Sequence, residues 1–395
     1  MNIKINIKDV PVSEMPAVAK ELGLKSYAAN QIIQWLYQKG VSSFDEMTNL
    51  SKGARDKLAE KYFIGGLRLD NKLESKDGTT KYAWKLADGK IIESVLILSD
   101  TFEEFIEKGG CYNRTIEPSN HRTRLTLCIS TQVGCAMGCT VCRTAKMGFI
   151  RNLTQGEIVE QILEAQRILF GHPCEGRDLV NARGSRFCGN DVSKITNVVL
   201  MGMGEPLMNY DNVVGAIRIM IDANGIGLSK RRITLSTCGL VPEIAKLAKE
   251  KLGIKLAISL SGTTDESRSK IMPVSKKYPL ADLMNACEEY AKLDNRHKIT
   301  FEYVMVNGVN DSDDDVKRLV GFMSRFSSKI NLIPFNQIGV WPQSNKGPDP
   351  YLKPSPRKRI DQFAEHLRNK HIQVNIRASR GQDILAACGQ LASKS

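Results

Sequence analysis

Residues 127–142 read LCISTQVGCAMGCTVC, a short β-type run followed by three cysteines, Cys135, Cys139 and Cys142, at the spacing C-x3-C-x2-C. A loop that follows a strand can wrap three such thiols around one metal centre. A closed structural zinc site takes four protein ligands, whereas a 4Fe-4S cluster held by three cysteines leaves one iron open to bind a small molecule. The spacing therefore favours a 4Fe-4S cluster with one open iron.

Two other interpretations of these cysteines stay open. A zinc ion could be bound if Cys128 or a distant histidine supplied the fourth ligand. The three cysteines could also be buried thiols that bind nothing.

Short apolar or β-branched runs alternate with longer amphipathic stretches along most of the chain. The runs are RLTLCI (124–129), TNVVLMG (196–202), RRITLS (231–236), IKLAISL (254–260), TFEYVMV (300–306) and INLIPF (330–335). Strands separated by helices are typical of parallel βα units with right-handed crossovers, and such sheets bind ligands at the carboxyl ends of their strands. The sequence therefore predicts an α/β fold in which six βα units form a partial or complete barrel.

The N-terminal part has the pattern of a small helical unit. Residues 14–60 place apolar side chains at helical intervals, as in YAANQIIQWLYQKG (27–40). KYAWKL (81–86) and IIESVLIL (91–98) are β-type runs on either side of Asp88–Gly89, a pair that favours a hairpin turn. We expect this hairpin to bridge two domains.

The chain divides into four predicted segments. They are a helical N-terminal accessory domain (1–80), the hairpin with a linker (81–123), the α/β barrel (124–345) and a C-terminal extension (346–395). The extension contains one amphipathic helical pattern and a short strand, IQVNIR, and the chain ends soon after Cys388.

Two charged or polar stretches, 100–124 and 172–193, interrupt the alternating pattern. Both are expected to be surface loops. They carry Cys111, Cys174 and Cys188, for which a free surface thiol is the expected state.

Small polar residues follow several predicted strands. In LMGMGEPLMNY (200–210), Gly202 and Gly204 would let the backbone approach a ligand, and Glu205 would offer a carboxylate to an ammonium group. Each residue alone also fits an ordinary βα turn. Together they predict a polar ligand rim, whose other members are Ser236, Ser259, Ser261 and Asn336.

Composition suits a globular protein with a polyanionic partner. Hydrophobic residues make up 42% and charged residues 25%, and 56 Lys and Arg against 43 Asp and Glu give a formal charge of +13. RNA, DNA or an acidic membrane surface all fit this charge. Residues 1–15 lack the apolar region of a signal peptide, and no later run is apolar for the roughly 18 residues of a membrane span. We therefore expect a cytoplasmic protein without a membrane partner, in which ten cysteines favour metal binding or catalysis over structural disulfides.

These motifs resemble the radical S-adenosylmethionine (radical SAM) superfamily and, within it, the RlmN and Cfr family of RNA adenosine methyltransferases. The matching stretches, in chain order, are IIESVLIL, LCISTQVGCAMGCTVC, GFIRNLTQGEI, TNVVLMGMGEPLMN, GLSKRRITLSTCGLVP, LAISLSG, NLIPFN and RGQDILAACGQL. The resemblance is closer to the RlmN branch. It implies a partial (β/α)6 radical-SAM barrel with a small helical N-terminal accessory domain and a C-terminal extension.

The resemblance also implies two cofactors. A 4Fe-4S cluster would be ligated by Cys135, Cys139 and Cys142, and each turnover would use two molecules of S-adenosylmethionine (SAM). One electron from the cluster would split SAM and give a 5'-deoxyadenosyl radical. The implied SAM contacts are Gly204, Glu205, Ser236, Ser259, Leu260, Ser261 and Asn336.

Three further residues gain catalytic roles from the resemblance. Cys388 would take a methyl group from one SAM molecule, and the radical from the second would remove a hydrogen atom from that S-methyl group. The resulting carbon radical would add to an adenine carbon that is too weakly nucleophilic for direct methyl transfer. Cys128 would then attack the Cys388 sulfur and form a transient disulfide as the RNA leaves, and Glu93 would accept a proton.

Without the resemblance each of these residues has a simpler interpretation. Cys388 fits a small buried side chain in a terminal helix, Cys128 a strand residue in the core, and Glu93 a hairpin residue that faces solvent. The chain departs from the usual family pattern at three positions, with Ser261 where His is common, Arg143 where a small residue or Ser is common, and Ala378 where a basic residue is common.

The implied reaction is methylation of C2 of an adenosine in 23S rRNA and in tRNA, by a monomer that takes electrons from a partner such as flavodoxin. Two rivals remain, namely Cfr-like methylation of C8 and a noncatalytic RNA-binding module whose cysteines hold zinc. The target adenosine must leave its stack, so a single-stranded loop is the expected substrate form. The basic residues expected to bind RNA phosphates, unless they only form a solvated face, are Lys230, Arg231, Arg232, Arg357, Lys358, Arg359, Arg377 and Arg380.

Overall fold

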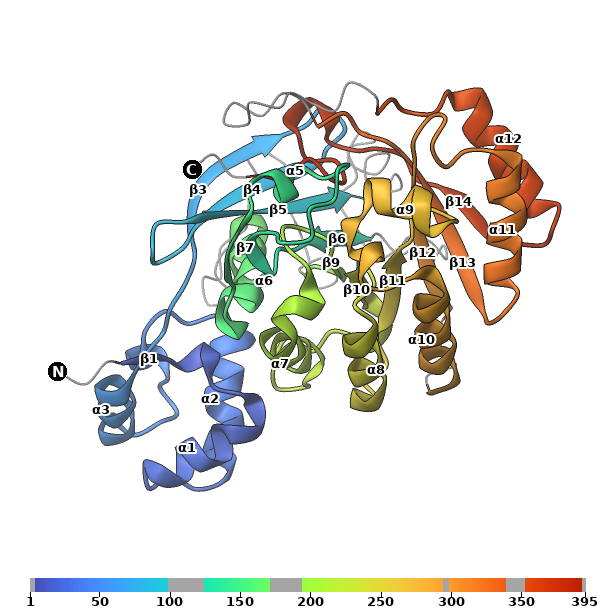
Figure 1. Cartoon of the computed structure of the whole chain (residues 1–395). Coiled ribbons are helices and arrows are strands. Elements are labelled where there is room, and N and C mark those ends of the chain that lie inside the picture. The colour runs from blue at the N-terminus through green and yellow to red at the C-terminus, as the bar shows by residue number, and fades with distance from the viewer. Residues whose placement is uncertain (1–3, 99–123, 171–193, 294–297, 339–351, 393–395) are drawn as a thin grey trace, which may run out of the picture.

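The computed structural model describes residues 4–98, 124–170, 194–293, 298–338 and 352–392. Within these residues one ten-stranded sheet runs through the molecule in the order β14-β13-β12-β11-β10-β9-β6-β5-β4-β3 (Figure 1). Over these residues the sheet does not close on itself, because β14 and β3 form its two edges. The predicted α/β barrel is therefore confirmed in its partial form. The stretches predicted as surface loops, with Cys111, Cys174 and Cys188, lie outside the described residues apart from Arg124.

The strands of the parallel part of the sheet follow one another in chain order. Six of them were predicted, and each pairs in parallel with the next. The short C-terminal strand then adds to the edge, also in parallel. In the described part of the chain these strands are β6 (Leu125–Cys128), β9 (Asn197–Leu200), β10 (Ile233–Thr237), β11 (Lys255–Ser259), β12 (Ile299–Met305), β13 (Ser328–Pro334) and β14 (Val374–Ile376).

Helices cover the outer face of this sheet (Figure 1). Those that connect or flank the parallel strands are α6 (Gln155–Phe170), α7 (Tyr210–Ile221), α8 (Val241–Glu250), α9 (Asp265–Ile271), α10 (Leu280–Leu293), α11 (Asp313–Met323) and α12 (Arg357–Arg368). Local sequence sets their ends. For example, α11 begins with a capping box in which Ser312 and Asp315 each accept from the other's backbone N–H.

The parallel strands bury one face more completely than the other. In β11, Leu256 and Ile258 are buried, whereas Lys255 and Ser259 point to the opposite side and are half-buried. Successive side chains of a strand point to opposite faces. The apolar set therefore faces the helices, and the polar set faces the inside of the partial barrel.

The predicted hairpin is confirmed by β4 (Thr80–Lys85) and β5 (Ile91–Leu98), which pair in antiparallel register. β5 also pairs with β6, so the hairpin is hydrogen-bonded into the barrel sheet. A further strand, β3 (Arg68–Glu74), was not predicted because its residues RLDNKLE are all exposed and lack alternation. The boundaries of the four predicted segments stay predictions.

The N-terminal helical unit is confirmed, and its elements are β1 (Ile5–Asn6), α1 (Met15–Glu21), α2 (Tyr27–Tyr37), α3 (Lys52–Lys61) and β2 (Tyr62–Phe63). β1 and β2 form a small parallel sheet of their own. Near the barrel, β7 (Gln132–Gly134) and β8 (Phe149–Asn152) form another small sheet, with α5 (Arg143–Lys146) between them in the chain.

Buried polar contacts attach the N-terminal unit to α6. Lys8 Nζ forms an ion pair with Glu160 Oε1, and each side chain is only 2% exposed. Asp9 Oδ1 accepts a hydrogen bond of 2.9 Å from Gly156 N near the beginning of α6, and Gln155 Nε2 donates to Lys8 O at 2.9 Å. The unit is thus fixed to the barrel by directional bonds as well as by apolar packing.

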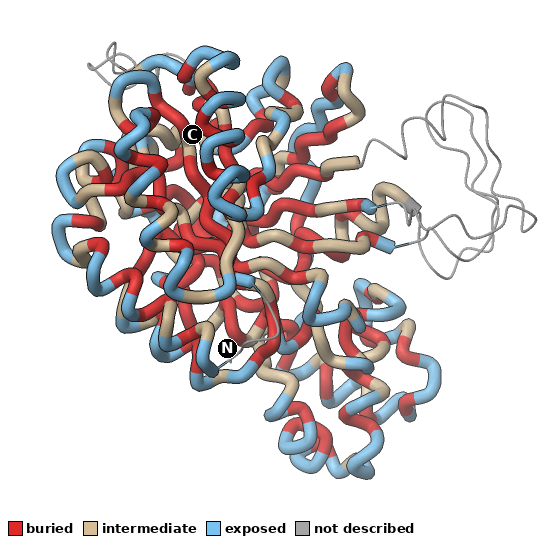
Figure 2. The backbone as a smooth tube through the Cα atoms, turned by 90° about the vertical axis from the view of Figure 1, so that its right-hand side faces the viewer, coloured by how far each residue is buried: buried red, intermediate tan, exposed pale blue. Residues whose placement is uncertain are grey.

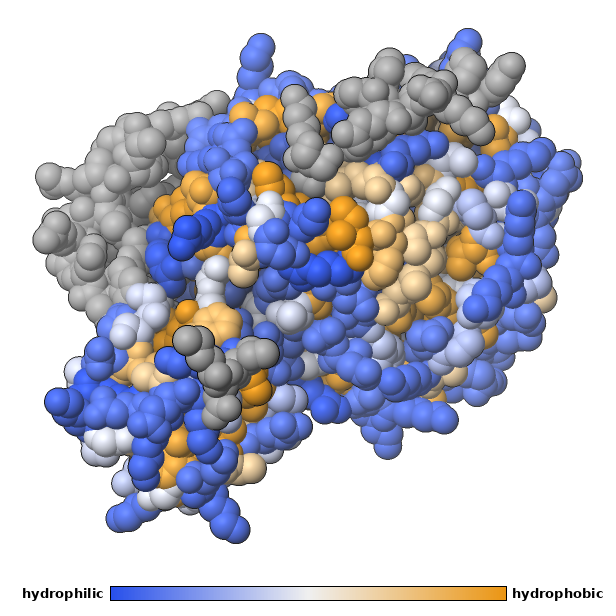
Figure 3. All heavy atoms as spheres, turned by 60° about the vertical axis from the view of Figure 1, so that its left-hand side comes forward, coloured by the Kyte–Doolittle hydropathy of each residue, from blue (hydrophilic) through white to orange (hydrophobic). Residues whose placement is uncertain are grey.

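The main core lies between the sheet and its helices. Figure 2 shows buried residues concentrated along the strands and exposed residues on the outer helices. Tyr303 of β12, for example, stacks on Phe363 of α12 with ring centroids 6.0 Å apart. On the face shown in Figure 3, hydrophilic side chains predominate and hydrophobic ones form separate patches. In the part of the chain that is described, no helix has the length and hydrophobicity needed to cross a membrane.

The Lys8–Glu160 pair yields a stability prediction. Lys8→Met should lower the free energy of unfolding by about 3–5 kcal/mol, because Glu160 would stay buried without its cation. The double variant Lys8→Met/Glu160→Leu should lose much less, since neither charge remains. Urea denaturation measures both. A double variant no more stable than the single one would show that the loss does not come from the unpaired carboxylate.

Candidate functional site

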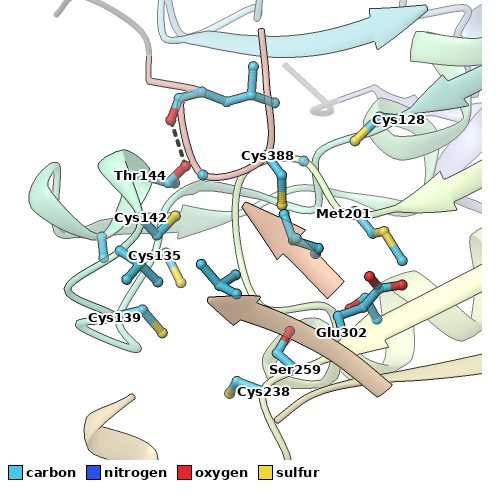
Figure 4. A pocket seen from close by; sticks show the side chains of 18 of the residues that line it. Cys128, Cys135, Cys139, Cys142, Thr144, Met201, Cys238, Ser259, Glu302 and Cys388 are labelled. Atoms are coloured by element: carbon cyan, nitrogen blue, oxygen red, sulfur yellow. Dashed lines mark hydrogen bonds between the residues drawn. The ribbon is translucent and has the colours of Figure 1, made fainter. Parts of the chain in front are cut away.

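A cavity of about 200 Å³ lies at the carboxyl ends of the parallel strands. A single buried water needs only about 10–15 Å³, so this cavity can hold a small-molecule ligand. Its wall is built from the strand ends, from the segment 135–142, here called the cysteine loop, and from the segment 381–392, here called the C-terminal loop (Figure 4).

The three cysteines of the motif share this cavity. Cys135, Cys139 and Cys142 all line it, and Figure 4 shows them on the same side. Burial raises the pKa of the Cys135 thiol to about 12 and also raises the pKa of Cys139, and neighbouring cysteine thiols raise both further. These thiols therefore need a cation nearby before they ionise.

The cysteine loop fits an iron-sulfur cluster in its donors. Three thiols from one short loop face one cavity, which is the donor set of a three-cysteine cluster. Among the described residues, however, no group of three or more Cys, His, Asp or Glu is close enough to hold a metal ion as it stands. A single ion needs its ligands within one coordination sphere, whereas in a 4Fe-4S cluster each cysteine binds a different iron and the three sulfurs stay farther apart.

Glu205 lines the cavity just after β9 and is 4% exposed. One carboxylate oxygen accepts from Leu207 N at 3.1 Å and the other from Cys238 N at 2.8 Å. Burial raises the pKa of the Glu205 carboxyl, although these hydrogen bonds oppose the effect. A ligand with an ammonium group would favour the ionised carboxylate.

Gly204 lets the chain pass close to β7 before Glu205. Its φ is +102°, and a Cβ atom there would lie 2.6 Å from Gln132 Cβ and 2.8 Å from Gln132 N. A side chain is therefore excluded at Gly204 both by its backbone conformation and by contact.

The other predicted rim residues are placed as follows. Ser236, Ser259, Ser261 and Asn336 line the cavity. Leu260 does not, because its side chain is fully buried in the core, so only its backbone could contact a ligand. Ser261 has a φ of +46°, and its hydroxyl oxygen accepts a hydrogen bond from a backbone N–H of β12.

Cys388 projects into the cavity from the C-terminal loop (Figure 4). The alternative of a buried side chain in a terminal helix is wrong, because the helical turn Gln382–Ile384 ends at Leu385, which has a φ of +53°, and the chain continues as a loop. The Cys388 side chain is accessible from the cavity. Protein atoms nevertheless surround it, and this burial raises the pKa of its thiol.

Hydrogen bonds to the cysteine loop and to the strand ends fix the C-terminal loop. Arg143 N donates to Gly389 O at 2.6 Å, and Thr144 Oγ1 donates to Leu391 O at 2.7 Å (Figure 4). Asn336 Nδ2 donates to Cys388 O at 3.2 Å. The residue after the third cysteine of the motif and the residue after Cys388 are therefore in direct contact.

Cys128 lies on β6 and lines the same cavity. Its side chain is 9% exposed, so the simpler interpretation of Cys128 as a buried strand residue is correct. The space that this side chain faces, however, is the cavity. Burial raises its pKa to about 12 and the Cys388 thiol raises it further, whereas the Arg377 guanidinium opposes both effects. Every cysteine in the described residues is a free thiol, including Cys128 and Cys388.

Glu93 is not a solvent-facing hairpin residue, so that alternative is wrong. It is 6% exposed. Its Oε1 lies 3.1 Å from Lys81 Nζ and its Oε2 accepts from Ala392 N at 2.9 Å. Glu93 does not line the cavity, because the end of the C-terminal loop covers it.

The structure adds a cavity residue that the sequence analysis missed. Glu302 of β12 lines the cavity, accepts from Asn331 Nδ2 at 2.8 Å and lies 3.8 Å from Arg377 Nη1. Arg377, which was expected near Cys388 as a phosphate contact, lines the same cavity as Cys388 and lies beside Met201. A single acid inside the otherwise apolar run TFEYVMV was the signal that could have identified Glu302.

Several other predicted phosphate contacts have partners within the protein. Arg357 pairs with Asp361 at 3.1 Å, and Arg359 pairs with Asp313 at 2.8 Å. Lys230–Arg232 form a short 3-10 turn before β10, where Arg232 donates to a backbone carbonyl.

Comparisons with known proteins match this chain to RNA methyltransferases of the radical SAM superfamily, and the relatives cover its whole length. The family model of the ribosomal RNA large subunit methyltransferase N-terminal domain matches residues 5–64, and that of the radical SAM superfamily matches residues 190–320. A protein of Pelobacter propionicus named dual-specificity RNA methyltransferase RlmN is 42% identical over 100% of this chain and 97% of its own. A relative of the same name from Geobacter sulfurreducens is 43% identical over 100% of this chain and 94% of its own.

A solved structure gives the same result for the fold. The crystal structure of a radical SAM methyltransferase from Sphaerobacter thermophilus superposes with a TM-score of 0.79 at 34% identity, covering 98% of this chain and 99% of that one.

The close passage of Gly204 past Gln132 can be tested by substitution. Gly204→Ala should lower the free energy of unfolding by about 1–3 kcal/mol, because the added methyl group meets Gln132 and the positive φ strains the backbone. Gly53→Ala is a matched control in α3, where nothing lies within 4 Å, and should stabilise by about 0.5–1 kcal/mol. Urea denaturation compares the two, and equal effects would contradict the close approach.

Proposed function

Because this chain belongs to the RlmN family of radical SAM RNA methyltransferases, we propose that it methylates C2 of an adenosine in 23S rRNA and in tRNA through an S-methylated Cys388. The observation that carries the proposal is the position of Cys388, which enters the same cavity as the three cysteines of the motif and Cys128. The family assignment also sets aside the noncatalytic zinc module.

The cavity wall supplies residues for both cofactors. Cys135, Cys139 and Cys142 would hold a 4Fe-4S cluster, which when bound supplies the electron that splits SAM. Glu205 would accept from the SAM ammonium group, and the remaining SAM contacts would be Gly204, Ser236, Ser259, Ser261, Asn336 and the backbone of Leu260. Two SAM molecules are used in each turnover, one as methyl donor and one as radical source.

Cys388 carries the transferred carbon. Its thiol loses a proton and takes a methyl group from SAM. The S-methyl group later gives a hydrogen atom to the 5'-deoxyadenosyl radical that a second SAM would supply, which becomes 5'-deoxyadenosine. The carbon radical then bonds to C2 of the adenine, so the base becomes tethered to the protein. Such a route is needed because C2 of adenine is too weakly nucleophilic to attack a sulfonium methyl group.

Cys128 releases the product. The tethered adduct loses the C2 proton and one electron, and a 4Fe-4S cluster held by the three cysteines of the motif would accept that electron. The Cys128 thiolate then attacks the Cys388 sulfur, so an S–S bond forms as the S–C bond breaks, and the freed methylene carbon gains a proton to become the methyl group. The cation of Arg377 supports this chemistry, since it favours the ionised form of both thiols.

Glu93 is proposed to accept the C2 proton, as the family resemblance implies. Its carboxylate is bonded to Lys81 and to Ala392 N, and the C-terminal loop separates it from the cavity. The role therefore requires the end of the C-terminal loop to move when RNA binds.

The remaining parts of the proposal concern the setting of the reaction. We infer that a monomer acts in the cytoplasm, where its RNA substrates lie, and that a small redox protein such as flavodoxin supplies the electron. The transient Cys128–Cys388 disulfide would then be reduced before the next turnover.

The position of methylation can be tested directly. Anaerobically reconstituted protein, given SAM, dithionite and either a 23S rRNA transcript or a tRNA transcript, should form 5'-deoxyadenosine and convert one adenosine to 2-methyladenosine. Nuclease digestion followed by mass spectrometry against nucleoside standards measures the product. If 8-methyladenosine alone formed, the C2 assignment would be wrong.

The role of Cys128 predicts a trapped intermediate. Cys128→Ala should leave RNA bound covalently to Cys388, because the carbon bridge forms but no thiol can resolve it. A denaturing gel that separates free from protein-linked RNA shows the product. Cys287→Ala is the control, since Cys287 is a buried thiol of α10 that does not line the cavity, and its RNA should be released. Release of methylated RNA by the Cys128 variant would refute the role.

A further inference from the structure

The inner face of the parallel sheet is polar and accessible beside the cavity. Closed (β/α)8 barrels fill this space with bulky branched side chains. Here the half-buried positions of neighbouring strands are mostly polar, and they include Asn197, Thr234, Lys255, Lys329 and Asn331. Polar groups accessible to solvent can take part in binding a polar ligand.

The sheet register places two lysines on this inner face. Cys128 pairs with Val199, Val199 with Thr234, and Thr234 with Lys255, so these residues form one row across four strands. Residues that pair side by side point to the same face. Because Cys128 lines the cavity, Lys255 also points to the inner face.

A second row gives the same result for Lys329. Ser236 pairs with Ala257, Ala257 with Thr300, and Thr300 with Lys329. Ser236 lines the cavity, so the side chain of Lys329 lies on the inner face too. Lys255 and Lys329 are therefore on the same side of the sheet as the thiols of the proposed reaction.

The inner face carries an excess of positive charge around these lysines. Partial burial lowers the pKa of Lys255, and the nearby cations of Lys329, Arg124 and Arg232 lower it further. Lys329 lies near the carboxylate of Glu302, which is itself 3.8 Å from Arg377. We call Arg232, Lys255 and Lys329 the inner basic strip.

We propose that the inner basic strip binds the phosphates of the single-stranded RNA segment that carries the target adenosine into the cavity. The inference rests on the proposed function and adds a path by which the RNA reaches Cys388. Like charges held together without enough acidic partners favour a polyanion, and lysine binds phosphate as a point charge.

The spacing of the strip fits an RNA strand beside the target base. Lys255 is three strands from Cys128, and Lys329 is three strands from Ser236, so each lies at most about 14 Å along its row from a residue of the cavity wall. Phosphates flanking a base in the cavity can lie within this distance, particularly since a lysine side chain extends several ångströms from its Cα. SAM, by contrast, is assigned to the cavity residues at the carboxyl ends of the strands.

RNA binding by a double variant tests the proposal. Lys255→Gln/Lys329→Gln should bind a fluorescent tRNA transcript and a 23S rRNA hairpin at least tenfold more weakly than the parent at equal salt, as measured by anaerobic fluorescence anisotropy. The slope of log Kd against log salt concentration should fall in magnitude by about 1.4, since each lost phosphate contact on a single strand contributes about 0.7.

The matched control removes the same charge from the outer surface. Lys246→Gln/Lys249→Gln alters two exposed lysines of α8 and should leave both the affinity and the salt slope at parental values. If the Lys255/Lys329 variant also kept parental affinity and slope, or if both variants weakened binding equally, the assignment of the inner basic strip would be overturned.

A second measurement separates this inference from the proposed function. S-methylation of Cys388 by SAM in the absence of RNA can be followed by mass spectrometry of the C-terminal peptide, and it should persist in the parent and in both double variants. No S-methyl group on the parent would count against the proposed function. S-methylation in all proteins with unchanged RNA binding would count against the strip alone.

Discussion

The site depends on the contact between the cysteine loop and the C-terminal loop. The hydrogen bonds from Arg143 N to Gly389 O and from Thr144 Oγ1 to Leu391 O join two segments that lie more than half the chain apart. Gly389 has a φ of +82°, and a Cβ atom there would lie 2.6 Å from Val141 O. Only glycine permits this approach, and the approach places Cys388 opposite the three cysteines of the motif.

Buried charges next to the cavity are held largely by backbone groups. Arg268 is fully buried and donates to Cys238 O at 2.5 Å, while Glu205 accepts from Cys238 N at 2.8 Å. The backbone of Cys238, which directly follows β10, thus lies between the buried Arg268 guanidinium and the buried Glu205 carboxyl group. Nη1 of Arg268 has no hydrogen-bond partner in the described part of the chain. Leaving such a buried group without a partner costs free energy.

Sequence patterns predicted the parts of the fold that depend on local periodicity. The six parallel strands and the hairpin at Asp88–Gly89 were identified because buried strands are apolar and tight turns favour Asp-Gly. β3 was missed because an exposed edge strand lacks an apolar face. The rim residues were predicted because parallel strands end at a common edge. Glu302 was missed because it lies within β12, where only the sheet register shows which way a side chain points.

The two thiols of the proposed reaction differ in how firmly the fold holds them, and this difference bears on the proposed chemistry. Cys128 belongs to β6, which is hydrogen-bonded on both sides to β5 and β9. Moving it would break a central part of the sheet. Cys388 lies on a loop held by a few bonds, so local displacement of that loop costs far less free energy. The reaction needs one sulfur to meet SAM, the adenine and then the second thiol in succession. Since a strand residue cannot make these moves, the difference supports the proposed roles, with the carbon carrier on the loop and the resolving thiol on the strand.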